Sequence, residues 1–294
     1  QTPKAYMEEL DAQVDQDRKV LGKKPFDRDD EDHMGGGMTK RMHSTSDPES
    51  GQQSREGKPD GFHYSEHRTV DSKRNVIVNV HIEPANLNDV TPLPEILDEI
   101  QARLGKLPKY MGLDAGYHNT WIAHLLEKKG IQGVIGYRRH THKTPTYGKY
   151  RFKYDSYFDA YICPEHKHLY WKTTTREGYR QYFCDSKICK VCPRRTECFG
   201  ASMTRRMVER HVWQDALDDV MAFTKSEQGR RIYRWRKETI ERSFAEAKVN
   251  HGLRYARMLG IRNMREQSFL TAAVQNIKRL VASWPRTFLS CSCL

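Results

Sequence analysis

Two acidic residues and one lysine provide the chemistry that the sequence suggests most clearly. Asp114 ends a short apolar segment that we predict to be a strand, the place where side chains of a sheet project into a cleft. Glu241 and Lys248 stand seven residues apart in residues 233–248, which lack Pro and Gly and predict a helix with both on one face. Carboxylates bind Mg²⁺, and phosphoryl transfer uses two such ions. The alternatives are a turn aspartate and a solvated basic helix.

The charge balance indicates a polyanionic partner. The chain of 294 residues has 50 Lys and Arg against 38 Asp and Glu, a net charge of +12 and a pI near 9.3. Nucleic acid is the partner that such an excess favours. The mean hydropathy is -0.85. No apolar run reaches the roughly 18 residues that a membrane helix needs, and no signal peptide is recognisable.

The cysteines predict a metal site. Five of the seven fall in residues 163–198, where Cys189 and Cys192 form a CxxC pair. Cys198 follows at a usable distance, and Cys163 could supply a fourth thiolate to a tetrahedral Zn²⁺. The candidates that remain open beside these are Cys184, His166 and His168. The alternative is a set of reduced cysteines without metal.

Residues 138–153 form a basic and aromatic stretch. They contain eight Lys, Arg or His residues and no acid, and the aromatic residues that accompany them are Tyr137, Tyr147, Tyr150 and Phe152. Cations that contact phosphates and aromatic rings that stack on bases suit a nucleic-acid surface. The alternative is an exposed loop with ordinary half-buried aromatic side chains.

The order of predicted elements indicates a mixed α/β sheet. An amphipathic helix over residues 1–21, carrying Leu10 and Val14, precedes a polar linker to residue 59. The elements expected after it are a hairpin of strands 62–70 and 76–82, helix 93–104, strand 110–114, helix 121–126, strand 134–136 and helices from 213 onward. In the last helix, Phe269, Ala272, Ala273, Ile277 and Leu280 form an apolar stripe. The expected domains are 1–59, 60–148, a Cys-rich insertion at 149–212, a helical part at 213–284 and a tail at 285–294.

Residues 113–117 (Leu-Asp-Ala-Gly-Tyr), residues 240–244 (Ile-Glu-Arg-Ser-Phe) and Lys248 together resemble the DDE transposases of bacterial insertion sequences. The subgroup with a cysteine-rich insertion in its catalytic domain is most similar, over roughly residues 38–283. The resemblance implies an RNase H-like fold in which three carboxylates hold two Mg²⁺ ions for DNA cleavage and strand transfer. Asp114 matches the second acid and Glu241 the third.

The same resemblance assigns further residues. Lys248 is expected to contact DNA phosphate, and the zinc ligands implied are Cys163, Cys189, Cys192 and Cys198. The tyrosine and arginine that the family carries upstream of the glutamate fall on Arg234 and Lys237 here, which is a departure from the pattern. Apart from the resemblance, the basic stretches around residues 138–153 and around Glu241 add further residues expected to bind the DNA backbone, so that the full set is Lys248, Arg138, Arg139, Lys143, Arg236 and Arg242.

The first acid of the family has no counterpart in this sequence. It is expected on an opening strand before the hairpin, and residues 1–61 predict no such strand. Asp47, Asp60 and Asp71 lie in turn sequences, Asp-Pro, Asp-Gly and Asp-Ser. The expectation is therefore an N-terminally truncated copy that is inactive alone.

The function predicted is that of a DNA transposase that uses Mg²⁺, with a structural Zn²⁺. Its partners would be the ends of its insertion element, target DNA and a second copy of the chain in a homodimer. It would act in the bacterial cytoplasm, associated with the nucleoid when bound to DNA. Two other readings are a non-catalytic zinc-stabilised nucleic-acid-binding module and a structure-specific nuclease that lacks strand transfer.

Overall fold

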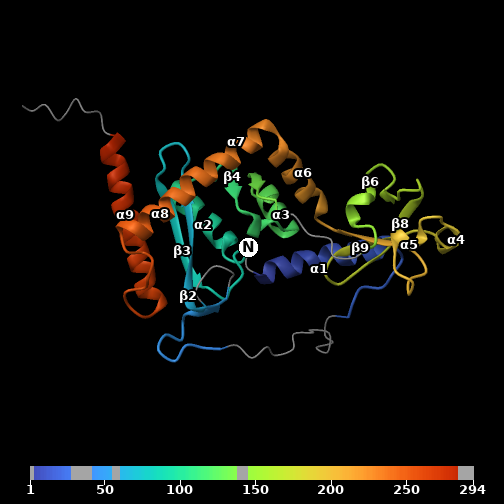
Figure 1. Ribbon diagram of the computed structural model, residues 1–294, viewed down its shortest axis with the longest axis horizontal. Coiled ribbons are helices and arrows are strands. Elements are labelled where there is room, and N and C mark those ends of the chain that lie inside the picture. The colour runs from blue at the N-terminus through green and yellow to red at the C-terminus, as the bar shows by residue number, and fades with distance from the viewer. Residues whose placement is uncertain (1–2, 28–41, 55–59, 138–144, 284–294) are drawn as a thin grey trace, which may run out of the picture. The chain divides into compact units, whose positions relative to one another are not determined.

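A computed structural model describes residues 3–27, 42–54, 60–137 and 145–283 (Figure 1). The chain divides into two compact units. In the described ranges, the first unit contains residues 3–27, 119–124 and 145–219. The second contains residues 42–54, 60–118, 125–137 and 220–283. No helix within these ranges is both long enough and apolar enough to span a lipid bilayer.

The first unit is built on an antiparallel sheet of five strands in the order β10-β9-β8-β7-β6. These strands are β6 (Lys153–Asp155), β7 (Ala160–Ile162), β8 (His168–Thr174), β9 (Tyr179–Phe183) and β10 (Met207–His211). The unit also contains α1 (Pro3–Val20), the 3-10 turn η3 (Lys149–Arg151), and the short helices α4 (Ser186–Lys190) and α5 (Arg195–Cys198). The Cys-rich segment thus folds around a sheet of its own.

The N-terminal helix belongs to this first unit. Leu10 and Val14 are buried, as its amphipathic pattern predicts. Asp17 is 3% exposed, and its carboxylate accepts hydrogen bonds of 2.6 and 2.7 Å from the Arg180 guanidinium on β9. The Thr174 hydroxyl on β8 donates to the same carboxylate. A buried carboxylate paired in this way fixes α1 to the sheet, because losing the partner would leave a charge without compensation.

The second unit contains two small sheets. One has the order β1-β2-β3, and the other is a parallel pair, β4-β5. The strands are β1 (Gly51–Gln53), β2 (Gly61–Val70), β3 (Ile77–Pro84), β4 (Tyr110–Leu113) and β5 (Gln132–Ile135). The helices and turns are α2 (Leu93–Leu104), the 3-10 turn η2 (Ala115–Tyr117), α7 (Glu227–Arg236), the π turn η4 (Lys237–Glu241), α8 (Arg242–Asn250) and α9 (Ile261–Ser283). Helices α3 (Thr120–Lys128) and α6 (Gln214–Lys225) contribute residues to both units.

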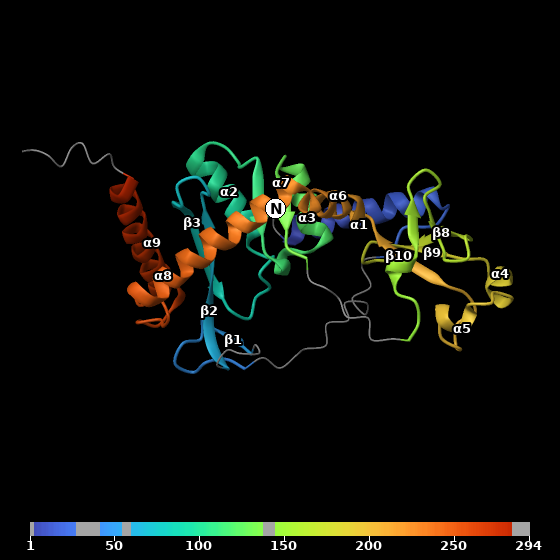
Figure 2. The same ribbon diagram turned by 45° about the horizontal axis from the view of Figure 1, so that its top comes forward.

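Residues 42–54 depart from the predicted polar linker. Gly51–Gln53 form β1, which pairs with the start of β2 (Figure 2). Asp47 is 9% exposed, accepts a 2.8 Å hydrogen bond from the Tyr64 hydroxyl and also accepts from the Gly260 backbone N–H. Hydrogen-bonded burial therefore orders a polar segment that composition alone describes as a linker.

The β2–β3 hairpin has one apolar and one polar face. Val80 and Ile82 of β3 are buried in a cluster with Ala247 of α8 and Met264 and Ala272 of α9. The opposite face carries Asn79, His81 and Glu83, and α2 lies over it (Figures 1 and 2). Because side chains alternate along a strand, the apolar face packs against α8 and α9, and the polar face forms hydrogen bonds with α2.

Of the apolar stripe predicted for α9, only Ala272 is buried. Phe269, Ile277 and Leu280 are 49%, 59% and 54% exposed. The side chains that α9 buries are those of Met264, Ser268, Thr271, Ala272 and Gln275. The reason is a polar network: the Arg68 guanidinium on β2 donates 2.8 Å hydrogen bonds to Gln275 Oε1 and to the Ser243 hydroxyl.

Candidate active site

Asp114 is positioned by the end of a parallel strand. Leu113, the last residue of β4, is buried between neighbouring elements, and Asp114 continues in an extended conformation. Its carboxylate Oδ1 caps η2 by accepting a 2.9 Å hydrogen bond from the Gly116 backbone N–H. Its side chain is 47% exposed, and Oδ2 lies 3.6 Å from the Arg236 guanidinium. The carboxylate is thus fixed by the backbone at one oxygen and open to a cation at the other.

Two pockets of the second unit share this carboxylate. The first, of about 410 Å³, and the second, of about 420 Å³, have five lining residues in common: Glu66, His67, Asp114, Tyr117 and Phe244. Asp89, Lys248 and Arg254 line the first pocket as well. Three acids and two cations therefore surround one cavity, a composition that suits a cation together with an anionic ligand.

A polar network holds the floor of these pockets. His67 Nε2 lies 2.8 Å from Glu83 Oε1, and His67 Nδ1 lies 3.0 Å from the Tyr117 hydroxyl oxygen. A neutral imidazole has one donor and one acceptor, so His67 donates to the Glu83 carboxylate and accepts from Tyr117. Burial raises the pKa of Tyr117, and the negative charges of Asp114, Asp89 and Glu83 raise it further. Tyr117 therefore remains a neutral phenol beside a group of carboxylates.

Two of these acids, Glu66 and Asp89, are not among the residues predicted from the sequence. Glu66 lies within β2 and accepts a 2.7 Å hydrogen bond from Arg68 Nε. Burial raises its pKa, although Arg68, Ser268 and Lys248 act in the opposite direction. A charged residue in the middle of a predicted strand is a signal that could have identified Glu66. Asp89 follows the end of β3 in a loop, where the sequence carries no comparable signal.

The helix that carries Glu241 is interrupted at that residue. Residues 237–241 form the π turn η4, between the α-helical segments α7 and α8. Arg236, Ile240 and Phe244 line the second pocket, whereas Glu241 is exposed and lines neither pocket. π turns inside α-helices are often found at functional sites. In this conformation the cation Arg236, and not Glu241, is the partner of Asp114.

The other residues predicted to contact DNA differ in where they lie. Lys248 lines the first pocket, where its ammonium lies 5.8 Å from the centre of the Phe244 ring. Arg242 is exposed and lines neither pocket. The predicted contacts Arg138, Arg139 and Lys143 lie outside the described residues.

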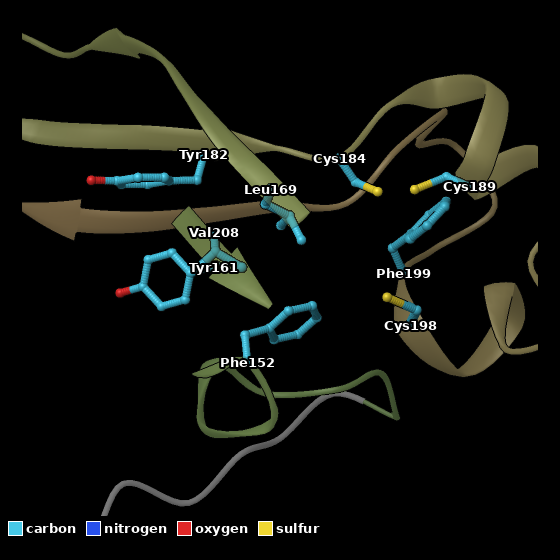
Figure 3. Packing of buried hydrophobic residues seen from close by; sticks show 9 residues of the cluster. All are labelled: Phe152, Tyr161, Leu169, Tyr182, Cys184, Cys189, Cys198, Phe199 and Val208. Carbon is cyan, nitrogen blue, oxygen red and sulfur yellow. The ribbon is translucent and has the colours of Figure 1, made fainter. Parts of the chain in front are cut away.

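The aromatic residues near that basic stretch have unlike environments. Tyr150 is 75% exposed, whereas Phe152 is only 5% exposed and belongs to the core of the first unit (Figure 3). Tyr147 is partly buried and donates a hydrogen bond to the Glu197 carboxylate. The prediction of a stacking surface is therefore wrong for Phe152, because the ring fills space beneath the sheet.

The cysteines gather at one end of the first unit's core. Cys184, Cys189 and Cys198 are buried, and Figure 3 shows their sulfur atoms on facing segments beside Phe199. Cys163 and Cys192 are half-buried, and Cys163 Sγ accepts a 3.3 Å hydrogen bond from the Lys167 backbone N–H. The five thiols are unpaired by disulfides.

The pKa values of the Cys184 and Cys198 thiols are raised by burial and by neighbouring cysteines. Burial raises the pKa of Cys184 to about 12, with a hydrogen bond to Cys189 and the charges of Cys189 and Cys163 adding to the effect. Burial also raises the pKa of Cys198 to about 11. Without a cation these thiols stay protonated, whereas a bound metal ion would favour thiolates.

The distances between possible ligand atoms favour a different group of residues as a metal site. Within the described ranges, one group of at least three His, Cys, Asp or Glu residues has its ligand atoms all within 4.8 Å of one another, and it consists of His81, Glu95 and Glu99. The four cysteines predicted as zinc ligands do not meet this limit as placed.

Residues 162–281 match the family model described as "Transposase DDE domain". The matched segment contains Glu241, Lys248 and all four cysteines of the predicted zinc site, and it begins after Asp114. No curated protein and no solved structure matches the chain.

Proposed function

We propose that this chain, of which residues 162–281 match a family model for the transposase DDE domain, forms the catalytic region of a DNA transposase in which Asp114 and Glu241 are two of the metal-binding acids. The observation that carries this proposal is the pocket around Asp114. There a carboxylate at the end of a parallel strand is accompanied by Asp89 and Glu66 and by the cations Lys248 and Arg254.

The donor set at this pocket fits Mg²⁺. Mg²⁺ takes oxygen ligands and usually keeps several waters, so it needs few carboxylates. Asp114 has one carboxylate oxygen without a backbone partner. The Glu241 carboxylate has no ion pair or hydrogen bond among the described residues. When bound, the ions would polarise the phosphodiester and stabilise the charge of its transition state. Asp114 and Glu241 would hold them.

The remaining side chains of the pocket have roles that need no metal. Lys248 and Arg254 offer positive charge to the DNA phosphate, and such contacts give salt-sensitive, sequence-independent affinity. Arg236 balances the charge of Asp114 until a stronger cation replaces it. The neutral Tyr117 hydroxyl is hydrogen-bonded to His67, which is in turn hydrogen-bonded to the Glu83 carboxylate.

We propose further that a strand carrying the first acid fills the second pocket. Consecutive residues of β2 (66–70) and of β4 (110–113) line its two sides. Within the described ranges, β4 pairs only with β5, and residues 64–70 of β2 pair only with β3. Each strand therefore has an open edge on this pocket, and such an edge binds a further strand readily.

The other two walls of this pocket are apolar helix faces. Leu93 and Ile96 come from α2, and Ile232, Trp235 and Ile240 come from α7 and η4. A strand covered by helices on both faces is apolar along its length. The arrangement supports an RNase H-like sheet in which the two small sheets of this unit are joined by the proposed strand.

We propose Zn²⁺ as a structural ion of the first unit, held by Cys163, Cys189, Cys192 and Cys198. The hydrogen bond from the Lys167 N–H to Cys163 Sγ supports a thiolate at that position. The proximity of the buried thiols supports a shared ion, and the ligand atoms would draw together on binding. Cys184 is hydrogen-bonded to Cys189, and it is the alternative fourth ligand.

The test is Mg²⁺-dependent cleavage of DNA by this chain, or by the chain extended by the residues encoded upstream of Gln1. Asp114→Asn is expected to abolish cleavage and to leave DNA affinity unchanged. Asp98→Asn, an equal change of charge at an exposed site on α2, is the control and should cleave normally. Cleavage by the Asp114→Asn protein at the normal rate would refute the proposal.

A non-catalytic nucleic-acid-binding module is the second candidate. The pairing of Asp114 with Arg236, and the position of Glu241 outside both pockets, favour it. It predicts salt-sensitive DNA binding by every variant and no cleavage by any of them, including the extended chain.

A further inference from the structure

The polar face of the β2–β3 hairpin brings three potential metal ligands together, away from the pockets described above. His81 lies on β3, and Glu95 and Glu99 lie one helical turn apart on α2. Their ligand atoms, one per side chain, are all within 4.8 Å of one another. None of the three lines either pocket that contains Asp114.

The two elements are fixed so that these side chains face each other. Asn79, two residues before His81 on the same face of β3, is 2% exposed and donates a 2.8 Å hydrogen bond to Glu99 Oε2. Arg103, one turn further along α2, donates to the Val78 carbonyl oxygen at 2.8 Å and to Asn79 Oδ1 at 3.3 Å. Asn79 thereby orients the Glu99 carboxylate, as outer partners do at metal sites.

Neither carboxylate has an ion-pair partner among the residues that the structure describes. Like charges four residues apart on a helix repel each other. In the described part of the chain no Lys or Arg forms an ion pair with Glu95 or Glu99, although Lys and Arg number 50 in the sequence. Arg103, the nearest candidate by position, is engaged with β3 instead. The cluster has its ligands oriented and its charge uncompensated.

We propose that His81, Glu95 and Glu99 bind a divalent first-row transition ion such as Zn²⁺ or Mn²⁺. The imidazole distinguishes the site from the oxygen-only sites that Mg²⁺ and Ca²⁺ prefer. Three protein ligands leave further positions for water. Because one ligand comes from β3 and two from α2, the ion would clamp this helix to the hairpin that carries Glu66 and His67. The site is independent of the proposed transposase chemistry.

The experiment uses Mn²⁺ as the probe, because Mn²⁺ is spectroscopically visible and binds thiolates poorly. The full chain with Asp114→Asn and Glu241→Gln is the background, so that the proposed Mg²⁺ site does not contribute. Pulsed electron paramagnetic resonance is expected to show coupling of the bound Mn²⁺ to a ¹⁴N nucleus. His81→Ala in this background should remove that coupling.

Affinity and stability provide the second measurement. Glu95→Gln preserves the shape of an exposed side chain and should still fold. It is expected to weaken Mn²⁺ binding at least about tenfold and to abolish the rise in melting temperature that Mn²⁺ causes. Asp98→Asn on the same helix is the control and should behave as the background does. Absence of ¹⁴N coupling in the background protein, its persistence in His81→Ala, or normal Mn²⁺ affinity of Glu95→Gln would each overturn the proposal.

Discussion

Acid is expected to destabilise the first unit through one histidine, His211. This residue, the last of β10, is 5% exposed and lies between aromatic rings, with its ring centre 5.1 Å from that of Tyr179 and 5.3 Å from that of Trp213. Its Nδ1 accepts a 3.1 Å hydrogen bond from the Trp213 backbone N–H. That nitrogen cannot accept the bond and carry a proton together, so the structure requires the neutral imidazole.

The magnitude follows from the pKa of His211. This pKa is lowered from 6.5 to about 4: burial is the main cause, the charges of His124 and Lys149 add to it, and a hydrogen bond with the Glu177 backbone opposes them. The unfolded chain then binds more protons than the folded one between these two values, so stability rises with pH in that window. Each pKa unit corresponds to ~1.4 kcal/mol. The contribution is about 3 kcal/mol, present above pH 6.5 and lost as pH falls through about 4.

The assay is urea unfolding of the wild-type chain and of His211→Gln, followed by tryptophan fluorescence from about pH 7.5 to about pH 4. Glutamine offers an acceptor to the Trp213 N–H and does not titrate. Other groups titrate equally in both proteins, so the difference between the two curves isolates His211. We expect the wild type to lose about 3 kcal/mol more than the variant over this range. Parallel curves would refute the reasoning.

Three further predictions concern packing and metal binding. Arg68→Met is expected to lower the free energy of unfolding by about 3 kcal/mol, because it leaves the buried Glu66 without its partner, and the loss should be smaller at low pH, where Glu66 is protonated. Met264→Ala should cost about 2 kcal/mol or more, whereas Ile277→Ser, at a 59% exposed position, should change stability by less than about 0.5 kcal/mol; equal losses would contradict the buried face assigned to α9. Cys192→Ser should lower the zinc content measured by elemental analysis, and Cys291→Ser should not; unchanged zinc in Cys192→Ser would exclude that ligand.

The hairpin and the strand that ends at Asp114 could be predicted because their signals are local. Alternating apolar residues define β3, and a short apolar segment before Asp114 defines β4. The buried face of α9 could not be predicted in this way. Its buried positions include Ser268, Thr271 and Gln275, which are polar, and Gln275 is buried because Arg68 of β2 binds it. Hydrophobic periodicity cannot predict a hydrogen bond between residues so far apart in the chain.

The same limitation applies to the candidate site. Helical spacing predicts Lys248 on one face with Glu241, but Lys248 lines the first pocket together with Phe244, whereas Glu241 lines neither pocket. Glu241 could not be placed, because its helix contains a π turn, and a π turn changes the angular relation between residues before and after it. Spacing rules based on 3.6 residues per turn therefore hold on either side of η4 and fail across it.

The pairing of Asp114 with Arg236 gives the interrupted helix a physical meaning. Arg236 packs so close to β4 that a side chain at Gly112 would lie 3.0 Å from its Cβ, which fixes this turn of the helix against the strand. Its guanidinium then supplies the positive charge that Asp114 faces, at a distance of 3.6 Å. A divalent ion carries twice that charge and binds the carboxylate oxygen directly, so it competes with Arg236 for the same group. The strength of metal binding at Asp114 is therefore set in part by how easily Arg236 is displaced, and the close contact at Gly112 restricts that displacement to the outer part of the arginine side chain.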